Sequence, residues 1–270
     1  MNVIESILNI SQLEILDVKR NIKSKNRINN IGDSLENFVE NSFTNFNTDL
    51  ELKSKTFSWL GNAKNPPDLI LRNSDAIEVK KMNTYSTIAL NSSFPRNRIF
   101  STDPMLTKNC SEIDGGDWEK NIYYFIGVMD KDSIETLFII DGSLYSADRE
   151  IYQKIKKTIK DSVTLIEGTE FSETKELGRV NKVDPLGITH LRIRGMWGIE
   201  NPFKVFNYIS GIEKPTKGKS KILALISETN WDNFPQESRN KIYKITKDIK
   251  VQNPNNPAEL IKAKFIRIDK

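Results

Sequence analysis

Two short apolar runs joined by a polar turn constrain the fold of this chain more than any other feature. Leu69-Ile70-Leu71 is followed by the polar residues Arg72 to Asp75, and these are followed by the run from Ala76 to Lys80. Runs of this length, bounded by Pro, Asn, Asp and Ser, are typical of β-strands. The sequence therefore predicts a β-hairpin whose strands are apolar enough to be buried.

Three charged residues interrupt these apolar strands. Asp68 begins the first strand, and Glu78 and Lys80 lie two residues apart on the second. Because residues i and i+2 of a strand face the same side, Glu78 and Lys80 point together while Val79 points into the core. Buried charges without partners are costly, so such a cluster usually indicates metal binding or catalysis. The alternative is a surface hairpin with solvated charges.

The composition limits the chemistry that such a cluster can perform. The 270 residues contain one Cys, Cys110, and one His, His190. This excludes an intramolecular disulfide and a Cys/His zinc cluster within the chain, and it argues against a hydrolase triad of the Ser/His or Cys/His type. A metal site must then use carboxylates and carbonyls, which suits Mg²⁺. The net charge of +4 permits a DNA partner without requiring one.

The N-terminal sequence gives no sign of export or membrane insertion. Asn2-Val3-Ile4-Glu5 places an acid where a signal peptide would be basic. No apolar run reaches the length of about 18 residues that a membrane-spanning helix needs. We therefore expect a cytoplasmic protein with no membrane partner.

Helices and strands are predicted to alternate along the chain. Apolar periodicity predicts helices over 3–16, 33–40 and 148–160, and strands over 57–60, 122–129, 136–140 and 222–226. Residues 190–197 alternate apolar and basic side chains, and 202–209 are helical or extended. Strands mixed with helices, and the absence of a linker-like stretch, favour a single α/β domain.

The acid-acid-lysine cluster has the groups that phosphodiester hydrolysis needs. Asp68 and Glu78 can hold Mg²⁺, and the Val79 carbonyl can serve as a further ligand. Lys80, beside them, can orient or deprotonate a water. The residues alone thus indicate a nuclease.

The pattern Pro67-Asp68 with Glu78-Val79-Lys80 resembles the PD-(D/E)xK signature of restriction-endonuclease-like nucleases. Blocks spread over most of the chain resemble NgoPII-like type II restriction endonucleases; they are 26–36, 65–81, 89–95 and 191–198. The resemblance implies a restriction-endonuclease-like α/β (α+β) core, with a central mixed β-sheet flanked by helices. It also implies N-terminal helices over about 1–46, a catalytic core over about 50–165 and a C-terminal DNA-recognition or structural part over about 166–270.

The same resemblance implies roles for individual residues. Asp68 and Glu78 would be metal ligands, and Lys80 would orient the nucleophilic water. Glu36 matches the position of an extra carboxylate near the metal in many of these enzymes. An acid in the first turn of a helix is equally explained by the helix dipole or a capping interaction, so both interpretations of Glu36 stay open.

Two segments are candidates for reading DNA. Asn91, Ser93, Arg96 and Arg98 lie in a probable loop rich in hydrogen-bonding side chains, and Arg192 and Arg194 alternate with apolar residues. Arginine reads guanine bidentately in the major groove, whereas phosphate contact and simple solvation are the alternatives.

The leading hypothesis is a Mg²⁺-dependent type II endonuclease that cuts double-stranded DNA as a homodimer. Its target would be a short palindrome, with GGCC as the candidate that the resemblance gives, and a cognate DNA methyltransferase would share that target without needing to bind the nuclease. The alternatives are a repair or junction-resolving nuclease, and a non-catalytic DNA-binding protein on the same fold. The cut position is not specified by the sequence.

Overall fold

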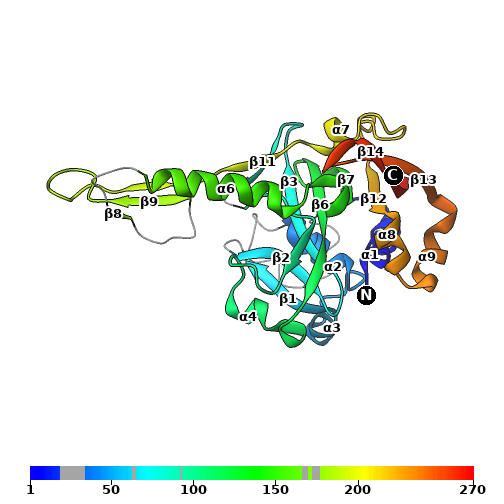
Figure 1. Ribbon diagram of the computed structural model, residues 1–270. Coiled ribbons are helices and arrows are strands. Elements are labelled where there is room, and N and C mark those ends of the chain that lie inside the picture. Colours follow the sequence, from blue (N-terminus) through cyan, green and yellow to red (C-terminus); the bar gives the residue numbers. More distant parts are fainter. Residues whose placement is uncertain (19–33, 63–64, 92, 166–169, 172–176) are drawn as a thin grey trace.

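A nine-stranded mixed β-sheet forms the centre of the molecule (Figure 1). The computed structural model describes residues 1–18, 34–62, 65–91, 93–165, 170–171 and 177–270. The strands of the sheet follow the order β1-β2-β3-β6-β7-β12-β14-β13, and β5 pairs with β6. Their bounds are Phe57–Asn62 (β1), Asn65–Leu71 (β2), Ala76–Met82 (β3), Arg98–Phe100 (β5), Glu119–Asp130 (β6), Ser133–Asp141 (β7), Lys221–Ser227 (β12), Thr246–Asn253 (β13) and Asn256–Asp269 (β14).

The pairing of these strands is both parallel and antiparallel. β3 runs parallel to β6, and β7 runs parallel to β12, whereas β2–β3, β6–β7 and β12–β14 are antiparallel. Strands β6, β7 and β12 lie in the middle and carry almost continuous buried runs, as expected where both sheet faces are covered. The predicted fold class, a mixed sheet flanked by helices, is confirmed.

Each face of the sheet carries its own apolar cluster. Along β6, Tyr123 and Phe125 belong to one cluster, and Tyr124 and Ile126 belong to the other. This follows from the alternation of side chains along a strand. The helices are α1 (Val3–Ser11), α2 (Ser34–Ser42), α3 (Leu50–Thr56), α4 (Lys108–Ser111), α5 (Gly142–Tyr145), α6 (Arg149–Val163), α7 (Pro202–Val205), α8 (Glu228–Asn233) and α9 (Gln236–Ile242), with 3-10 turns at Ile113–Gly115 and Tyr243–Ile245.

An arm projects from this body (Figure 1). It consists of α6 and a three-stranded sheet formed by β8 (Glu170–Phe171), β9 (Gly178–Asn181) and β10 (Leu191–Ile193). A separate two-stranded sheet pairs β4 (Ile88–Asn91) with β11 (Trp197–Ile199) and leads from the arm back to the body. None of the 15 residues of α6 is fully buried, in contrast to the central strands. The arm is therefore a thin extension, and in its described part Leu177 and Val180 are buried beside the half-exposed helix.

Most predicted elements are present, and the first helix is the clearest exception. It was expected to reach Leu16, but α1 ends at Ser11. Leu16 is buried in an extended segment instead, where its carbonyl accepts a hydrogen bond from the Ile134 amide at 2.8 Å. Pairing with β7 thus satisfies the apolar pattern that predicted more helix. The predicted cap at Asp33 lies outside the described residues.

Two further differences concern the C-terminal half. The alternating segment 190–197 does not form one strand; β10 ends at Ile193 and β11 begins at Trp197. A Cβ on the intervening Gly195 would lie 3.0 Å from the Leu177 side chain. The long β13–β14 hairpin was not predicted, because its lysines obscure the alternation of its apolar residues. In the described part of the chain, no helix is long and apolar enough to cross a membrane.

Candidate active site

The β2–β3 hairpin brings the three sequence-predicted charges together. The Val79 amide donates a hydrogen bond to Asp68 Oδ2 at 2.6 Å. Lys80 Nζ lies 2.5 Å from Glu78 Oε1 and 4.0 Å from Asp68 Oδ2. The three side chains are each only about one-fifth exposed (19–21%). As predicted, Val79 points away from them into the core, where it is 4% exposed.

Burial and crowding make Asp68 hard to ionise. Desolvation, with the nearby Glu78 carboxylate, raises the pKa of Asp68 from 3.8 to about 7, although Lys80 and the Val79 amide oppose this shift. Burial lowers the pKa of Lys80, but Glu78 and Asp68 outweigh that effect and the net shift is upward. The site therefore contains two close carboxylates and one firmly protonated ammonium.

Glu36 lies near enough to influence this site electrostatically. It occupies the first turn of α2, and its charge contributes to the raised pKa values of both Asp68 and Lys80. Glu36 itself is exposed, whereas Phe38, two residues later in the same helix, packs in the core. Both interpretations of Glu36 thus stay open: an extra carboxylate near the site, or an acid that stabilises the first turn of α2.

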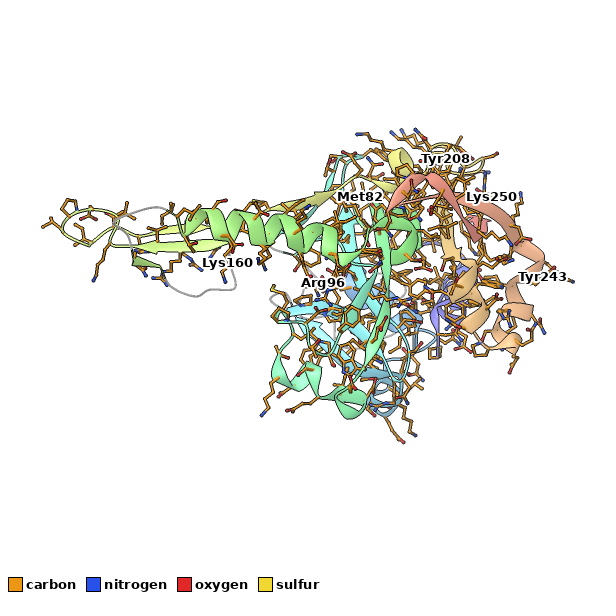
Figure 2. All side chains as sticks on the ribbon, viewed as in Figure 1. Met82, Arg96, Lys160, Tyr208, Tyr243 and Lys250 are labelled. Carbon is orange, nitrogen blue, oxygen red and sulfur yellow. The ribbon has the colours of Figure 1, made fainter. Side chains whose placement is uncertain are left out.

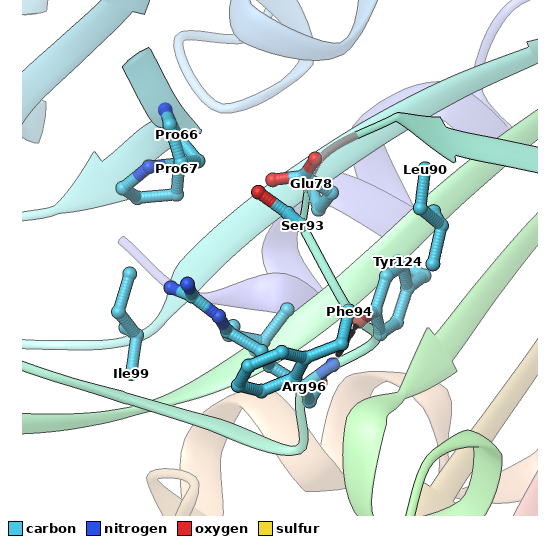
Figure 3. Close-up of a pocket in the computed structure, with 10 residues that line it drawn as sticks. Pro66, Pro67, Glu78, Leu90, Ser93, Phe94, Arg96, Ile99 and Tyr124 are labelled. Carbon is cyan, nitrogen blue, oxygen red and sulfur yellow. Dashed lines mark hydrogen bonds between the residues drawn. The ribbon is translucent and has the colours of Figure 1, made fainter. Parts of the chain in front are cut away.

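A pocket opens beside Glu78 (Figure 3). Its wall includes Pro66 and Pro67 on one side and Ser93, Phe94 and Arg96 on the other. Tyr124, on β6, fixes the second wall, because its hydroxyl accepts a hydrogen bond from the Arg96 amide at 2.7 Å and donates one to the Arg96 carbonyl at 2.9 Å. No pattern in the sequence indicates this role of Tyr124, since the two residues are 28 positions apart.

Close packing of the backbone also holds the Arg96 segment in place. A Cβ on Gly142, at the start of α5, would lie 2.8 Å from the Arg96 carbonyl oxygen and 2.9 Å from Asn97 Cα. Such distances are too short for any side chain. Gly142 is therefore required for the approach of α5 to the pocket wall.

The candidate DNA-reading residues differ in their exposure. Arg96 is buried, whereas Arg98 is exposed and its Nη1 lies 2.5 Å from Glu119 Oε1. Ser93 is half-buried, and the side chain of Asn91, at the end of β4, lies outside the described part of the structure. Arg192, in β10, and Arg194, just after it, are exposed on the arm. Only Ser93 and Arg96 line the pocket beside Glu78.

The fold and the site together define a nuclease of the restriction-endonuclease-like class. The comparisons with known proteins agree: the chain belongs to the NgoPII restriction endonuclease family, whose model matches residues 1–256. It is 45% identical over 278 aligned positions to the type II restriction enzyme NgoPII of Neisseria gonorrhoeae, and the alignment covers 98% of this chain and 99% of that protein. No solved structure matches it significantly. The protein is a type II restriction endonuclease, an enzyme that hydrolyses DNA site-specifically.

Proposed function

We propose that the enzyme cuts a short palindrome, with GGCC as the candidate, by Mg²⁺-dependent hydrolysis at Asp68, Glu78 and Lys80. The observation that carries this proposal is the meeting of both carboxylates and the ammonium group on adjacent strands. No other feature of the hairpin explains why these charges are held together at one-fifth exposure. The target sequence rests on the family resemblance.

The donor set fits Mg²⁺. Burial and the neighbouring Glu78 carboxylate raise the pKa of Asp68, and a bound divalent cation would favour its ionised form. In the described residues, no group of three or more His, Cys, Asp or Glu side chains is arranged to hold a metal. The candidate site offers fewer side-chain ligands than that: two carboxylates, from Asp68 and Glu78, together with the Val79 carbonyl. Mg²⁺ accepts such a set, since it commonly binds through one or two carboxylates and keeps several waters.

The chain's own residues then divide the work of hydrolysis. Bound Mg²⁺ would stabilise charge on the scissile phosphate and acidify water. Asp68 and Glu78 would hold the ion. Lys80 is held protonated by both acids, so it orients the attacking water and offsets negative charge and does not serve as the base. Glu36 would contribute an additional carboxylate at the edge of the site.

DNA recognition is assigned to the residues around the pocket and on the arm. Arg98, Arg192 and Arg194 are exposed and long enough to reach base edges, where arginine prefers guanine. Asn91 and Ser93 flank the pocket wall and are assigned to DNA contact as well. Arg96 differs from these residues because it is buried, and its role is considered separately below.

A homodimer suits a palindromic target, because two copies related by a two-fold axis present two active sites to two strands. The candidate contact is a stripe on α6, where Ile151, Ile155 and Ile159 are 46%, 46% and 38% exposed. Two such helices packed antiparallel about Ile155 would bring Ile151 against Ile159 of the second copy. Ile155→Lys should therefore yield monomers by sedimentation, whereas Lys154→Gln should not; a dimer that survives Ile155→Lys contradicts this interface.

Digestion of a plasmid of known sequence tests the function directly. Mapping the ends formed with Mg²⁺ gives activity, target and cut position together. Lys80→Ala should reduce cleavage by about 100-fold or more, whereas Lys81→Ala, at the exposed neighbouring position on β3, should cut normally. Equal cleavage by the Lys80→Ala and Lys81→Ala variants would contradict the assignment of the catalytic site. Cleavage of branched DNA without regard to sequence would indicate a structure-specific nuclease instead.

A further inference from the structure

Arg96 is buried without being fully paired. It is 9% exposed, and its Nη1 atom has no hydrogen-bond partner. The nearest acid is Asp103, whose Oδ2 lies 3.6 Å from that atom, beyond hydrogen-bond reach. Asp103 also pairs with Arg149 at 3.0 Å, so one carboxylate serves two guanidinium groups. Figure 3 shows the Arg96 guanidinium extending across the pocket toward Pro67.

Two lysines of α6 add to this positive charge. Lys156 and Lys160 lie one helical turn apart on the face of α6 that is partly covered. Within the part of the chain that the structure describes, neither ammonium group has a hydrogen-bond or ion-pair partner. Burial lowers the pKa of Lys156, and the nearby positive charges of Arg96 and Lys160 lower it further. The Lys156 ammonium is therefore close enough to be repelled by both Arg96 and Lys160.

An aromatic cluster fixes α6 against the pocket wall. The rings of Phe94 and Tyr152 stack at 5.4 Å, and Trp197 meets both rings edge-on at 6.0 and 5.7 Å. The Arg96 guanidinium lies over the Phe94 ring at 5.4 Å. The positions of Arg96 and of the α6 lysines are thus coupled by packing. Figure 2 places Arg96 where the arm joins the body and Lys160 farther along the arm.

Neighbouring cations with too few acids beside them are destabilising unless an anion joins them, and here Asp103 is shared between Arg96 and Arg149. Here the cations start at the pocket shared with Glu78 and continue along α6, one turn at a time. A DNA strand presents anions in such a row, and arginine and lysine are the side chains that neutralise them. The surface therefore has the shape and charge of a path for one DNA strand that leaves the cutting centre.

We propose that Arg96, Lys156 and Lys160 bind successive backbone phosphates of the DNA strand next to the scissile phosphodiester. The proposal rests on cleavage at the Asp68–Glu78–Lys80 site. It assigns Arg96 to phosphate binding, one of the alternatives that the sequence left open, and it gives α6 a role that its isoleucine periodicity did not indicate. Base reading remains with the exposed arginines.

Measurements of DNA binding under conditions that prevent cleavage test this proposal separately from the cleavage mechanism. Dissociation constants are measured in EDTA, over a series of salt concentrations, for a target-containing duplex and a scrambled duplex. Lys156→Gln/Lys160→Gln should weaken both duplexes alike, and the slope of log Kd against log salt should fall by about 2. The matched control is Lys154→Gln/Lys157→Gln, which removes the same charge from the exposed side of the same helix. It should leave the slope unchanged.

The remaining outcomes decide between the alternatives. Equal losses in the two double variants would mean a general charge effect and would overturn the proposal, as would a loss confined to the target duplex. Arg96→Gln, checked for folding by circular dichroism, should likewise weaken both duplexes; lost discrimination at a single base pair would return Arg96 to base reading. If Asp68→Asn still cleaves, the proposed catalytic site fails whatever the lysines do.

Discussion

Two acid-lysine clusters contact the β2–β3 hairpin, one at its strands and one at its turn, and their charges are balanced in opposite ways. At its turn, Asp114 and Lys120 form an ion pair of 2.7 Å with side chains only 7% and 5% exposed. Burial raises the pKa of Asp114, but hydrogen bonds from Lys120, Ser58 and the Asn73 amide outweigh it, and the net shift is downward. Lys120 also donates to the Ser74 carbonyl at 3.0 Å. Every charge in this cluster has its partners.

The cluster at Asp68 is more exposed and yet less balanced. Two carboxylates share one ammonium, and the pKa of Asp68 is raised to about 7 where that of Asp114 is lowered. Burial alone thus does not separate the structural pair from the cluster proposed to be catalytic. The difference lies in compensation: a balanced pair joins parts of the fold, whereas an excess of carboxylate leaves a place for a cation.

The largest effect on stability is expected at the balanced cluster. Asp114→Ala would leave the Lys120 ammonium buried without its partner, which should lower the free energy of unfolding by about 3 to 5 kcal/mol. Urea denaturation followed by fluorescence measures this change. A loss below about 1 kcal/mol, the range of surface ion pairs, would break the comparison, because Asp114 would then contribute no more than an exposed acid.

Substitution of Asp68, in the unbalanced cluster, should have the opposite effect on the stability of the metal-free protein. The folded-state pKa of Asp68 lies above its ordinary value of 3.8, so the folded protein holds this proton more tightly than the unfolded chain. The stability of the metal-free enzyme should therefore fall as pH rises from about 4 to about 7. Asp68→Asn removes this loss and should stabilise the metal-free protein at pH 8 by about 1 to 4 kcal/mol, while abolishing cleavage.

Thermal unfolding of the wild type and of Asp68→Asn in EDTA, at pH 5 and pH 8, measures this stabilisation. The difference between the two proteins should be largest at pH 8 and clearly smaller at pH 5. Mg²⁺ should then stabilise the wild-type enzyme at pH 8 and have little effect on Asp68→Asn, because the ligand is gone. A variant less stable than the wild type at pH 8 would show that Asp68 is structural, as Asp114 is.

The smallest effect is expected at Glu36, and it bears on the extent of the unbalanced cluster. Glu36→Gln should change stability by about 0.3 to 1 kcal/mol, the range for an acid at a helix N-terminus. If Glu36 belongs to the catalytic cluster, the rate of cleavage should fall by much more than this stability change explains. Cleavage rates at saturating DNA, compared between Glu36→Gln and Glu40→Gln at the other end of α2, measure this. Equal rates would confine the cluster to Asp68, Glu78 and Lys80.

How far the sequence predicted the molecule depended on the range of the interactions involved. The strands around Asp68 and Glu78 were predicted because both lie within one hairpin, where the alternation of side chains is local. The end of α1 was missed because Leu16 pairs with a strand more than 100 residues away. The burial of Arg96 could not be predicted either, because Tyr124 and Gly142, which belong to other elements, hold its backbone in place.

The sequence by itself determined the acid-acid-lysine cluster proposed as the cutting centre: Glu78 and Lys80 face one side of a strand because residues i and i+2 must, and Asp68 joins them across a four-residue turn. The tertiary structure decided which of the chain's many cations border that centre. Arg96 meets Lys156 only because the Phe94–Tyr152–Trp197 cluster packs α6 against the pocket wall. Contacts between residues so far apart in the chain depend on packing of the whole fold, which leaves no local pattern in the sequence.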